Sequence, residues 1–404
     1  MYTDWRAACS FYGLTPILLP YNISHPKVYE LLKAADANSV ICAAGSIPLD
    51  DVSKACPNIG LVTWVVEKTS GHMDWNGVPD SAEGRLSAGV WHDIVEENIS
   101  TATADLPSND MGDAPGSIVT IWQNIHDLSL PPTITTFTHA NFTSAIAALI
   151  SALPLRQRFG PSDLVLPASS FNIPYVLCQT FAALFTHASI SITSVAEPGV
   201  DLALARRGIR PTVIIASAET MAKLHALETK DISSMIQKVS KASQAQTMSA
   251  GRMPTDTLLF RLLAPSSTGS KPGQLRLILT SERLGAGSPK LTSTMLSDLR
   301  IFTRARIVYA LTGAAICGAV AQSNVFDYRR EDGQEYAHFG VPPGSVEVKL
   351  KGSESEGTLS GNQPEGKVLV GGPAVAASGD EREGGWVGLG VRGRFREDGT
   401  LALI

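Results

Sequence analysis

The stretch TPILLPYNISHPKVYELLKAADANSVICA, residues 15–43, places a strand pattern, a helix pattern and a second strand pattern in succession. Thr15–Leu19 is a short apolar run, and Pro26–Ala35 repeats its apolar residues at helical spacing. Ser39–Ala43 is apolar again, and GLVTWVV at 60–66 adds a further strand. Because strands separated by helices form parallel sheets, this stretch predicts an α/β fold.

The same alternation continues through the middle of the chain. Helix patterns occupy Asn141–Leu153 and Pro174–His187, and Lys223–Gln246 is predicted to be one long helix. Short apolar runs predict further strands at 117–122, 163–167, 188–192, 211–216 and 275–279.

The pattern changes after about residue 340. Ser345–Leu350 alternates apolar and polar residues, glycines become frequent, and helical periodicity disappears. We therefore expect three parts: a first αβ subdomain over 1–190, a second over 191–340, and a β-barrel-like antiparallel subdomain over 341–404.

The composition is that of a globular protein with a large core. Of 404 residues, 44% are hydrophobic and 18% are charged, with a net charge of -5. The basic residues do not cluster, which argues against a nucleic-acid partner. The longest apolar runs are well short of the roughly 20 residues that cross a bilayer, so no membrane span is expected.

The five cysteines indicate reduced thiols in a cytoplasmic protein. They are odd in number, lie far apart among apolar neighbours, and have no metal-ligand spacing; they are Cys9, Cys42, Cys56, Cys178 and Cys317. A disulfide framework is the less favoured alternative, and no metal site is expected.

Eight segments carry a resemblance that covers nearly the whole chain. In order they are AACSFYGLTPILLPYNISHPKVYELLKAADANSVICA from Ala7, THAN from Thr138, DLVLPASSFNIPYVL from Asp163, RRGIRPTVIIASAETMAKL from Arg206, LRLILTSERLGAGSPKL from Leu275, ARIVYALTGAA from Ala305, GKVLVGGPAVA from Gly366 and GGWVGLGVRGRFREDGTLALI from Gly384. Together they resemble the adenylate-forming superfamily of acyl-CoA synthetases, adenylation domains, luciferases and fatty-acyl-AMP ligases. The opening segment is similar to the fatty-acyl-AMP-ligase-like domains of disco-interacting protein 2 and its fungal relatives.

The resemblance implies a large N-terminal domain from a protein of lipid metabolism. Such a domain has two αβ subdomains with mostly parallel sheets packed together, followed by a smaller antiparallel β subdomain. In the family a hinge and a small C-terminal lid with a catalytic lysine follow. This sequence stops at Leu401–Ile404, near the hinge, so the lid is expected to be absent and other domains of a parent protein are expected partners.

The family's reaction sets clear demands on its residues. A carboxylate attacks the α-phosphate of ATP, pyrophosphate leaves, and an acyl-adenylate remains. The phosphates need a glycine-rich loop whose backbone N–H groups come close. Mg²⁺ needs oxygen ligands, and the ribose hydroxyls need an acceptor.

Two of these demands are not met in the segments that should meet them. The counterpart of the phosphate loop, Asn124–Phe137, contains neither glycine nor lysine, and Thr133 stands where the family has its lysine. Tyr309 and Thr312 match the family, but Gly313 stands where the magnesium-binding glutamate should be. Glycine has no side chain with which to bind a metal.

The ribose and adenine positions also depart from the family. Val391 replaces the aspartate that accepts the ribose hydroxyls, and valine accepts no hydrogen bond. Ser281 and Glu282 replace the two glycines that pack on adenine. Glu282 offers a carboxylate, but a solvated turn is the favoured interpretation there. Four separate changes predict that ATP is not activated and that no cofactor is required.

The acyl side is better preserved than the nucleotide side. Phe171, Asn172 and Tyr175 are compatible with the wall of an apolar pocket, although ordinary core packing is the simpler interpretation. We therefore expect a degenerate adenylation-like domain that acts as a scaffold or as an acyl- or lipid-binding module. The alternative is an active fatty-acyl-AMP ligase or acyl-CoA synthetase that uses ATP and Mg²⁺ with a diverged loop. A hydrolase is disfavoured because Gly-x-Ser-x-Gly does not occur.

Overall fold

A computed structural model describes residue 9 and residues 12–20, 23–66, 85–100, 116–124, 127, 129–193, 197–232, 234–253, 274–330, 337–352, 364–377, 382–383 and 385–404. The chain forms two compact units, Met1–Val119 and Thr120–Ile404. Each unit is described by itself.

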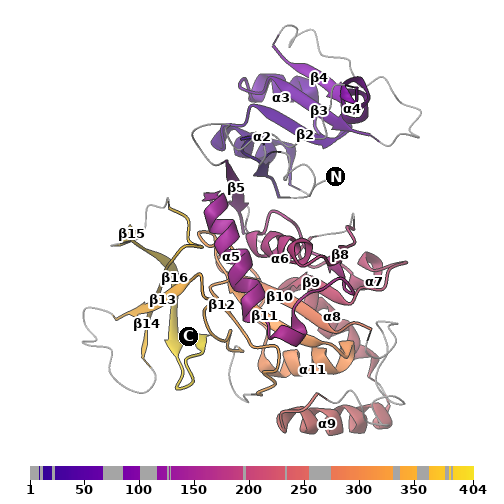
Figure 1. The fold of residues 1–404 in the computed structure, drawn as a ribbon, viewed down its shortest axis with the longest axis vertical. Helices are drawn as coiled ribbons and strands as arrows, with labels where there is room; N and C mark the ends of the chain where they lie inside the picture. The colour runs from indigo at the N-terminus through magenta and orange to yellow at the C-terminus, as the bar shows by residue number, and fades with distance from the viewer. Residues whose placement is uncertain are drawn as a thin grey trace. The chain divides into compact units, whose positions relative to one another are not determined.

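The first unit is built on a three-stranded parallel sheet with the order β2-β3-β4 (Figure 1). Its elements are β1 (Ile17–Leu18), α2 (His25–Ala34), β2 (Ser39–Ala43), α3 (Leu49–Ala55), β3 (Leu61–Val65), β4 (Ser87–Val90) and α4 (Trp91–Asn98). Pro26 lies in the first turn of α2, where its fixed φ favours a helix and its missing N–H leaves no bond unmade. Leu32, Val52 and Trp64 belong to the apolar core of this unit.

A six-stranded sheet forms the centre of the second unit. Its order is β12-β11-β10-β9-β7-β8, with β12 antiparallel to its neighbour and the other pairs parallel. The strands are β7 (Leu164–Pro167), β8 (Ser189–Ile190), β9 (Val213–Ser217), β10 (Leu277–Arg283), β11 (Arg306–Thr312) and β12 (Ala321–Gln322). Every residue of β9 and β10 is buried, as expected for a parallel sheet with both faces covered.

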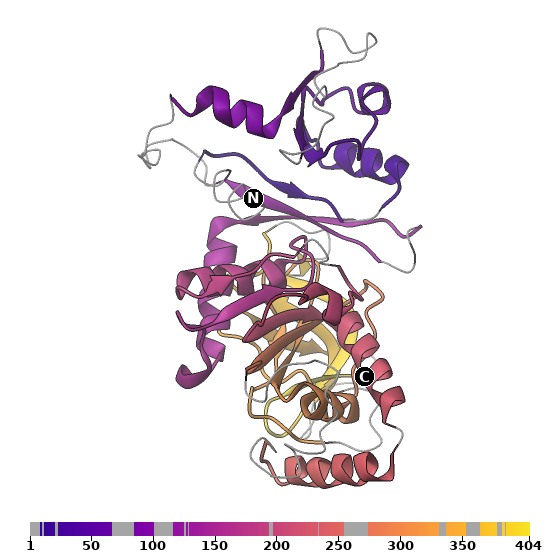
Figure 2. The ribbon, with the colours of Figure 1, turned by 90° about the vertical axis from the view of Figure 1, so that its right-hand side faces the viewer.

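Helices cover the two faces of this sheet (Figures 1 and 2). α6 (Pro174–Phe185), α8 (Ala218–Asp231) and α11 (Ser293–Thr303) pack on its strands, whereas α5 (His139–Ala152) packs on α6 and α9 (Met235–Ser249) packs on α11. The short helix α7 (Leu202–Ala205) and a 3₁₀ turn at Leu155–Gln157 also belong to this unit. Thr138 begins α5 with a capping box, in which its hydroxyl accepts from the N–H of Asn141 and the Asn141 side chain accepts from the N–H of Thr138.

An antiparallel sheet lies at the C-terminal end of the second unit. Its order is β13-β14-β16-β15, and β17 also pairs with β16. The strands are β13 (Glu347–Lys351), β14 (Glu365–Gly371), β15 (Arg382–Glu383), β16 (Trp386–Phe395) and β17 (Leu401–Leu403). Gly393 permits close packing here, because a Cβ at this position would lie 2.8 Å from Val368 Cγ2. Two further strands, β5 (Ser117–Trp122) and β6 (Thr133–Thr138), precede the six-stranded sheet in sequence and pair with each other.

The predicted fold class is confirmed: the chain has parallel α/β sheets and a separate antiparallel sheet at its C-terminal end. The predicted subdomain boundaries near residues 190 and 340 stay predictions. The single helix expected over Lys223–Gln246 is wrong, because α8 ends at Asp231 and Ser234 caps a new helix, α9. Among the helices that the structure describes, none has the length and apolar character needed to cross a membrane.

Candidate functional site

The carboxyl ends of β10 and β11 bring five of the predicted nucleotide-site residues together. These strands pair in parallel, and Glu282 lies opposite Leu311 while Arg283 lies opposite Thr312. Tyr309 lies opposite Thr280, two residue pairs before Glu282, and Gly313 directly follows β11. In open α/β sheets this end of the strands is where ligands bind, so the geometry of these residues decides what the site can do.

Glu282 and Tyr309 are joined in the interior. The Tyr309 hydroxyl donates to Oε2 of Glu282 and accepts the N–H of Leu291 at 3.2 Å. The hydroxyl of Thr312 donates to the backbone oxygen of Glu282 at 2.7 Å. Glu282 is 4% exposed and Tyr309 is fully buried, so both polar groups use partners inside the protein.

The solvated turn expected at Glu282 is therefore wrong. The strand pairing extends one residue beyond it, to Arg283, so Glu282 is still part of the sheet. Ser281 is buried beside Ala310 on the next strand. The sequence pattern missed this because a polar Thr-Ser-Glu-Arg run after an apolar strand is also typical of an exposed turn.

Burial changes the protonation of the Glu282–Tyr309 pair. Desolvation raises the pKa of Glu282 to about 7, while the hydrogen bond from Tyr309 and the charge of Lys290 oppose the rise. The negative charge of Glu219 acts in the upward direction. Burial and the adjacent Glu282 also raise the pKa of the Tyr309 hydroxyl well above its ordinary value. Near neutral pH the tyrosine is a donor, and the carboxyl group is about half protonated.

Gly313 is surrounded by aliphatic side chains. A Cβ at this position would lie 3.3 Å from Cδ1 of Ile316 and 3.5 Å from Cδ2 of Leu389. Ile316 is fully buried, and Leu389 comes from β16 of the antiparallel sheet. The space next to Gly313 is therefore apolar, and a longer polar side chain there would displace one of these neighbours.

A second polar network adjoins this pair and was not predicted. Nη2 of Arg283 lies 3.0 Å from Oε1 of Glu219, and the Ser288 hydroxyl donates to the same oxygen at 2.7 Å. Although burial alone raises the pKa of Glu219, the Arg283 charge and the Ser288 hydrogen bond hold it below its ordinary value. The guanidinium also lies over the ring of Trp122, 6.0 Å from its centroid. Glu219 sits in the first turn of α8, a position that sequence alone marks only as favourable for the helix dipole.

Tyr175 lies apart from this pair, on α6. Its hydroxyl donates to Oε1 of Gln322 on β12 at 3.1 Å, and burial raises its pKa well above the ordinary value. Gln322 lies opposite Ala310, so α6 covers the face of the sheet opposite to the Tyr309 side chain. Phe171 and Asn172 precede α6 and are half-buried, whereas Tyr175 is part of the core.

The remaining two predicted residues lie on other elements. Thr133 is the exposed first residue of β6, so the end of the expected phosphate-loop segment, 133–137, is a strand. Val391 lies within β16 and is half-buried. Leu389, two residues before Val391, packs against Gly313 and connects β16 to the end of β11.

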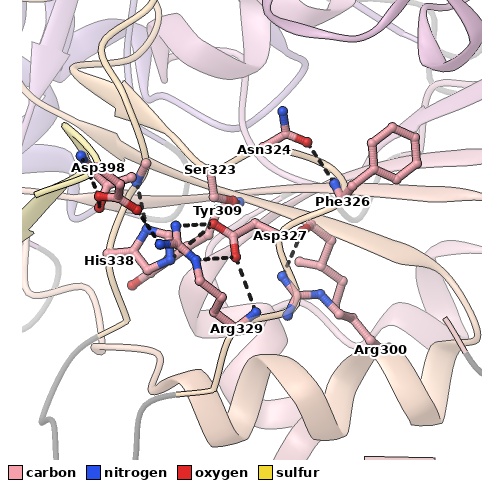
Figure 3. A network of polar contacts seen from close by, with 12 residues as sticks. Arg300, Tyr309, Ser323, Asn324, Phe326, Asp327, Arg329, His338 and Asp398 are labelled. Carbon is pink, nitrogen blue, oxygen red and sulfur yellow. Dashed lines mark hydrogen bonds and ion pairs between the residues drawn. The ribbon is translucent and has the colours of Figure 1, made fainter. Parts of the chain in front are cut away.

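Charged residues near the C-terminus form another unpredicted network, shown in Figure 3. Asp327 lies 2.6 Å from Nη2 of Arg329 and 3.2 Å from Nε2 of His338. Arg329 also bonds to Asp398 in the turn between β16 and β17, and the Thr400 hydroxyl donates to Asp398 at 2.7 Å. This network fastens the segment after β12 to the last turn of the antiparallel sheet.

The pKa values of the two carboxyl groups in this network are lowered, whereas the pKa of Glu282 is raised. Burial alone would raise the pKa of Asp327, but its bonds to Arg329 and His338 hold it far below the ordinary value. Burial likewise raises the pKa of Asp398, but its bonds to Thr400 and Arg329 together hold that pKa below the ordinary value. These carboxylates are charged at neutral pH. Over the described ranges no group of three or more His, Cys, Asp or Glu side chains is placed to hold a metal ion.

Comparisons with known proteins identify the fold. No protein-family model and no curated protein matches this sequence. Solved structures do match. The N-terminal domain of FACL13 from Mycobacterium tuberculosis aligns with a TM-score of 0.63 and 14% identity, over 98% of this chain and 81% of that one.

Two further structures are CoA synthetases or ligases by their descriptions. O-succinylbenzoate coenzyme A synthetase MenE from Bacillus subtilis, in complex with ATP and magnesium, aligns with a TM-score of 0.59 and 14% identity over 98% of this chain. The anthranilate CoA ligase AuaEII, in complex with anthranoyl-AMP, aligns with a TM-score of 0.64 and 14% identity over 97% of this chain. This chain spans 65% of the MenE chain and 63% of the AuaEII chain. The chain thus shares the fold of these solved structures.

Proposed function

We propose that the chain is an adenylation-type domain whose nucleotide site no longer activates ATP, and that it serves as a scaffold or as an acyl- or lipid-binding module in a larger protein. The proposal rests on the fold and on the residues that occupy the nucleotide side of the site. Its main support is the apolar packing around Gly313.

The position after Thr312 is where the family's magnesium-binding glutamate is expected. Here Gly313 has no side chain, and the space beside it is occupied by Ile316 and Leu389. Mg²⁺ needs a carboxylate oxygen in a polar, partly hydrated setting. Two aliphatic side chains provide neither, so the residues present do not fit the metal.

Glu282 does not substitute for the missing glutamate. Its carboxyl group already accepts the Tyr309 hydroxyl, and its pKa near 7 leaves it largely protonated in mildly acidic solution. A carboxyl group must lose its proton to act as a metal ligand. A metal would therefore have to displace both the proton and the tyrosine.

The ribose and phosphate positions support the same proposal. Val391 stands at the position of the ribose aspartate, and the nearby Leu389 is directed at Gly313. Thr133, at the position of the phosphate-loop lysine, begins a strand. An acceptor replaced by an apolar residue leaves a ligand hydroxyl unpaired, which costs about 1–3 kcal/mol per buried group.

The acyl side carries the binding part of the proposal. Phe171 and Asn172 are half-buried on the connection between β7 and α6. Tyr175, which follows them in the first turn of α6, is held in the core by its bond to Gln322. An acyl chain or another lipid is the small molecule that such an apolar wall would accept.

Pyrophosphate exchange tests the loss of ATP activation. The chain, and any longer protein that contains it, should catalyse no exchange of labelled pyrophosphate into ATP with fatty acids of any length. Gly313→Glu should not restore exchange, because its neighbours are aliphatic. Measurable exchange in the unmodified protein would favour the alternative, an active fatty-acyl-AMP ligase.

A fluorescent fatty acid tests the acyl-binding part separately. Phe171→Ala should weaken binding of the probe at least several-fold. Phe185→Ala is the matched control, because Phe185 is 74% exposed at the end of α6 and should leave binding unchanged. If the probe does not bind, or if both variants behave alike, the domain is a scaffold without an acyl site.

A further inference from the structure

Two cysteines that are 139 residues apart in sequence meet in the second unit. Sγ of Cys178, on α6, lies 3.4 Å from Sγ of Cys317, in the loop between β11 and β12. Both side chains are fully buried. We propose that this pair is a redox modification site, in which a peroxide converts the two thiols into a disulfide that links α6 to the loop after β11.

Each sulfur is held in place by contacts of the backbone that carries it. Cys317 donates its N–H to the backbone oxygen of Ala374 at 2.9 Å. The next residue, Gly318, has φ +95° and lies so close to α5 that a Cβ would be 3.2 Å from Cβ of Ala145. On the other side, Tyr175 fixes the first turn of α6 through Gln322. The two thiols are therefore kept facing each other by independent anchors.

The geometry requires only a small movement for bond formation. A disulfide has an S–S distance of about 2.05 Å, so the sulfurs must approach by about 1.4 Å. Small rotations about the side-chain bonds of both cysteines supply such a shift. The residue after Cys317 is Gly318, which has a positive φ and has no side chain that could block the approach of the two sulfurs.

The reaction balances with hydrogen peroxide as the oxidant. The thiolate of one cysteine attacks a peroxide oxygen, the O–O bond breaks, and a sulfenic acid forms with release of hydroxide. The second thiol attacks the sulfenic sulfur, the S–O bond breaks, and water leaves. In total two thiols lose two electrons and two protons, and one peroxide becomes two molecules of water. Because the pair is buried, we expect small oxidants to react and bulky thiol reagents to be excluded.

The link would act on the part of the molecule that holds the candidate site. The loop that carries Cys317 begins with Gly313, immediately after β11. A disulfide between two cysteines that are 139 residues apart closes a long loop in the unfolded chain. This constraint on the unfolded chain stabilises the folded state. Oxidation would therefore fix the end of β11 against α6. This inference does not depend on the proposed loss of ATP activation.

Peptide mapping tests the proposal directly. The folded protein is treated with hydrogen peroxide at rising concentration, blocked with N-ethylmaleimide in urea, and digested with trypsin without reduction. Cys178 lies in the tryptic peptide 159–206 and Cys317 in 307–329, and each peptide contains one cysteine. We expect the two peptides to appear linked, and the link to disappear after reduction by dithiothreitol.

Matched variants and a denatured sample complete the test. Cys178→Ala and Cys317→Ala should each abolish the linked peptide, while Cys42→Ala, at a half-buried position on β2, should leave it intact. Peroxide should raise the melting temperature of the wild type by several degrees and leave that of Cys178→Ala unchanged. The proposal is overturned if no 159–206 to 307–329 link forms at a concentration that oxidises Cys42. It is equally overturned if the folded and urea-denatured proteins give the same mixture of links.

Discussion

Glu282 is buried and Asp327 is partly buried in the second unit, and the pKa values of these two carboxyl groups shift in opposite directions. Glu282 receives a hydrogen bond from a neutral hydroxyl, and its pKa rises to about 7. Asp327 is bonded to a guanidinium and an imidazole, and its pKa lies far below the ordinary value. The difference shows that burial alone does not set the charge of a carboxyl group, and that the charge of its hydrogen-bond partners also matters.

The comparison has consequences for both regions. The Asp327 network is charged and gives stability at neutral pH, which fits a structural role between β12 and the last turn of the antiparallel sheet. The Glu282–Tyr309 pair is close to neutral, although it occupies the end of the sheet where ligands usually bind. This end of the sheet thus contains a closed hydrogen bond between Glu282 and Tyr309.

The largest effect is expected from Asp327→Asn. Removing the carboxylate charge takes a hydrogen-bond partner from His338 and leaves Arg329 with Asp398 alone, and a hydrogen bond to a charged group contributes about 1.5–3 kcal/mol. The folded pKa of Asp327 is lowered, so its contribution is fully present above about pH 4 and is lost as the pH falls further. Urea unfolding at pH 7 and at pH 3 measures both the size and the pH dependence.

Asp398→Asn is the control for that prediction. Asp398 bonds to the same Arg329, but its side chain is 40% exposed, and exposed pairs contribute at most about 1 kcal/mol. A loss as large as that of Asp327→Asn would show that the contacts of Asp398 in the turn, and not those of Asp327, hold the network together.

Glu282→Gln should change stability in the opposite direction. The folded pKa of Glu282 is raised, so the wild type loses stability as the pH rises from about 4.5 to about 7. Glutamine carries no charge and still accepts the Tyr309 hydroxyl. The gain in stability of the variant over the wild type should grow by about 2 kcal/mol between pH 5 and pH 8.

The matched control is Glu347→Gln, at an exposed position on β13, which should show no pH-dependent difference. If Glu282→Gln also shows none, Glu282 is charged in the folded protein and the assignment of a largely protonated carboxyl group fails.

The smallest effect is expected from Tyr309→Phe. The ring remains packed against Phe339, with the ring centroids 4.7 Å apart, but Glu282 and the N–H of Leu291 lose their shared partner. The expected loss is about 1 kcal/mol in thermal or urea unfolding. Tyr12→Phe, at a position that is 57% exposed, should be neutral. Equal free energies of unfolding for the two variants would mean that the buried Tyr309 hydroxyl does not contribute to stability.

Most of the fold could be predicted from the sequence, because apolar strands and periodic helices leave local signals. The runs 211–216 and 275–279 are the central strands β9 and β10, and the helix at Pro174 starts where its proline predicts. The break before α9 was missed because the Ser234 capping box sits inside a continuous polar helix pattern. Local signals also fail where a polar residue, such as Glu282, belongs to a strand.

The site could be predicted only in part. The absence of a carboxylate at position 313 is visible in the sequence, but the packing of Ile316 and Leu389 beside it is not. Leu389 reaches Gly313 from a strand that lies far along the chain. The pairing of Asp327 with His338 and Asp398 likewise depends on tertiary contacts that no spacing rule predicts.

Calorimetric titration of the chain with ATP and Mg²⁺ tests the central claim most directly. The packing at Gly313 and the closed Glu282–Tyr309 pair predict no measurable heat of binding up to millimolar nucleotide, at pH 6 and at pH 8 alike. Micromolar affinity that depends on Mg²⁺ would contradict the account and would show that the nucleotide site is functional.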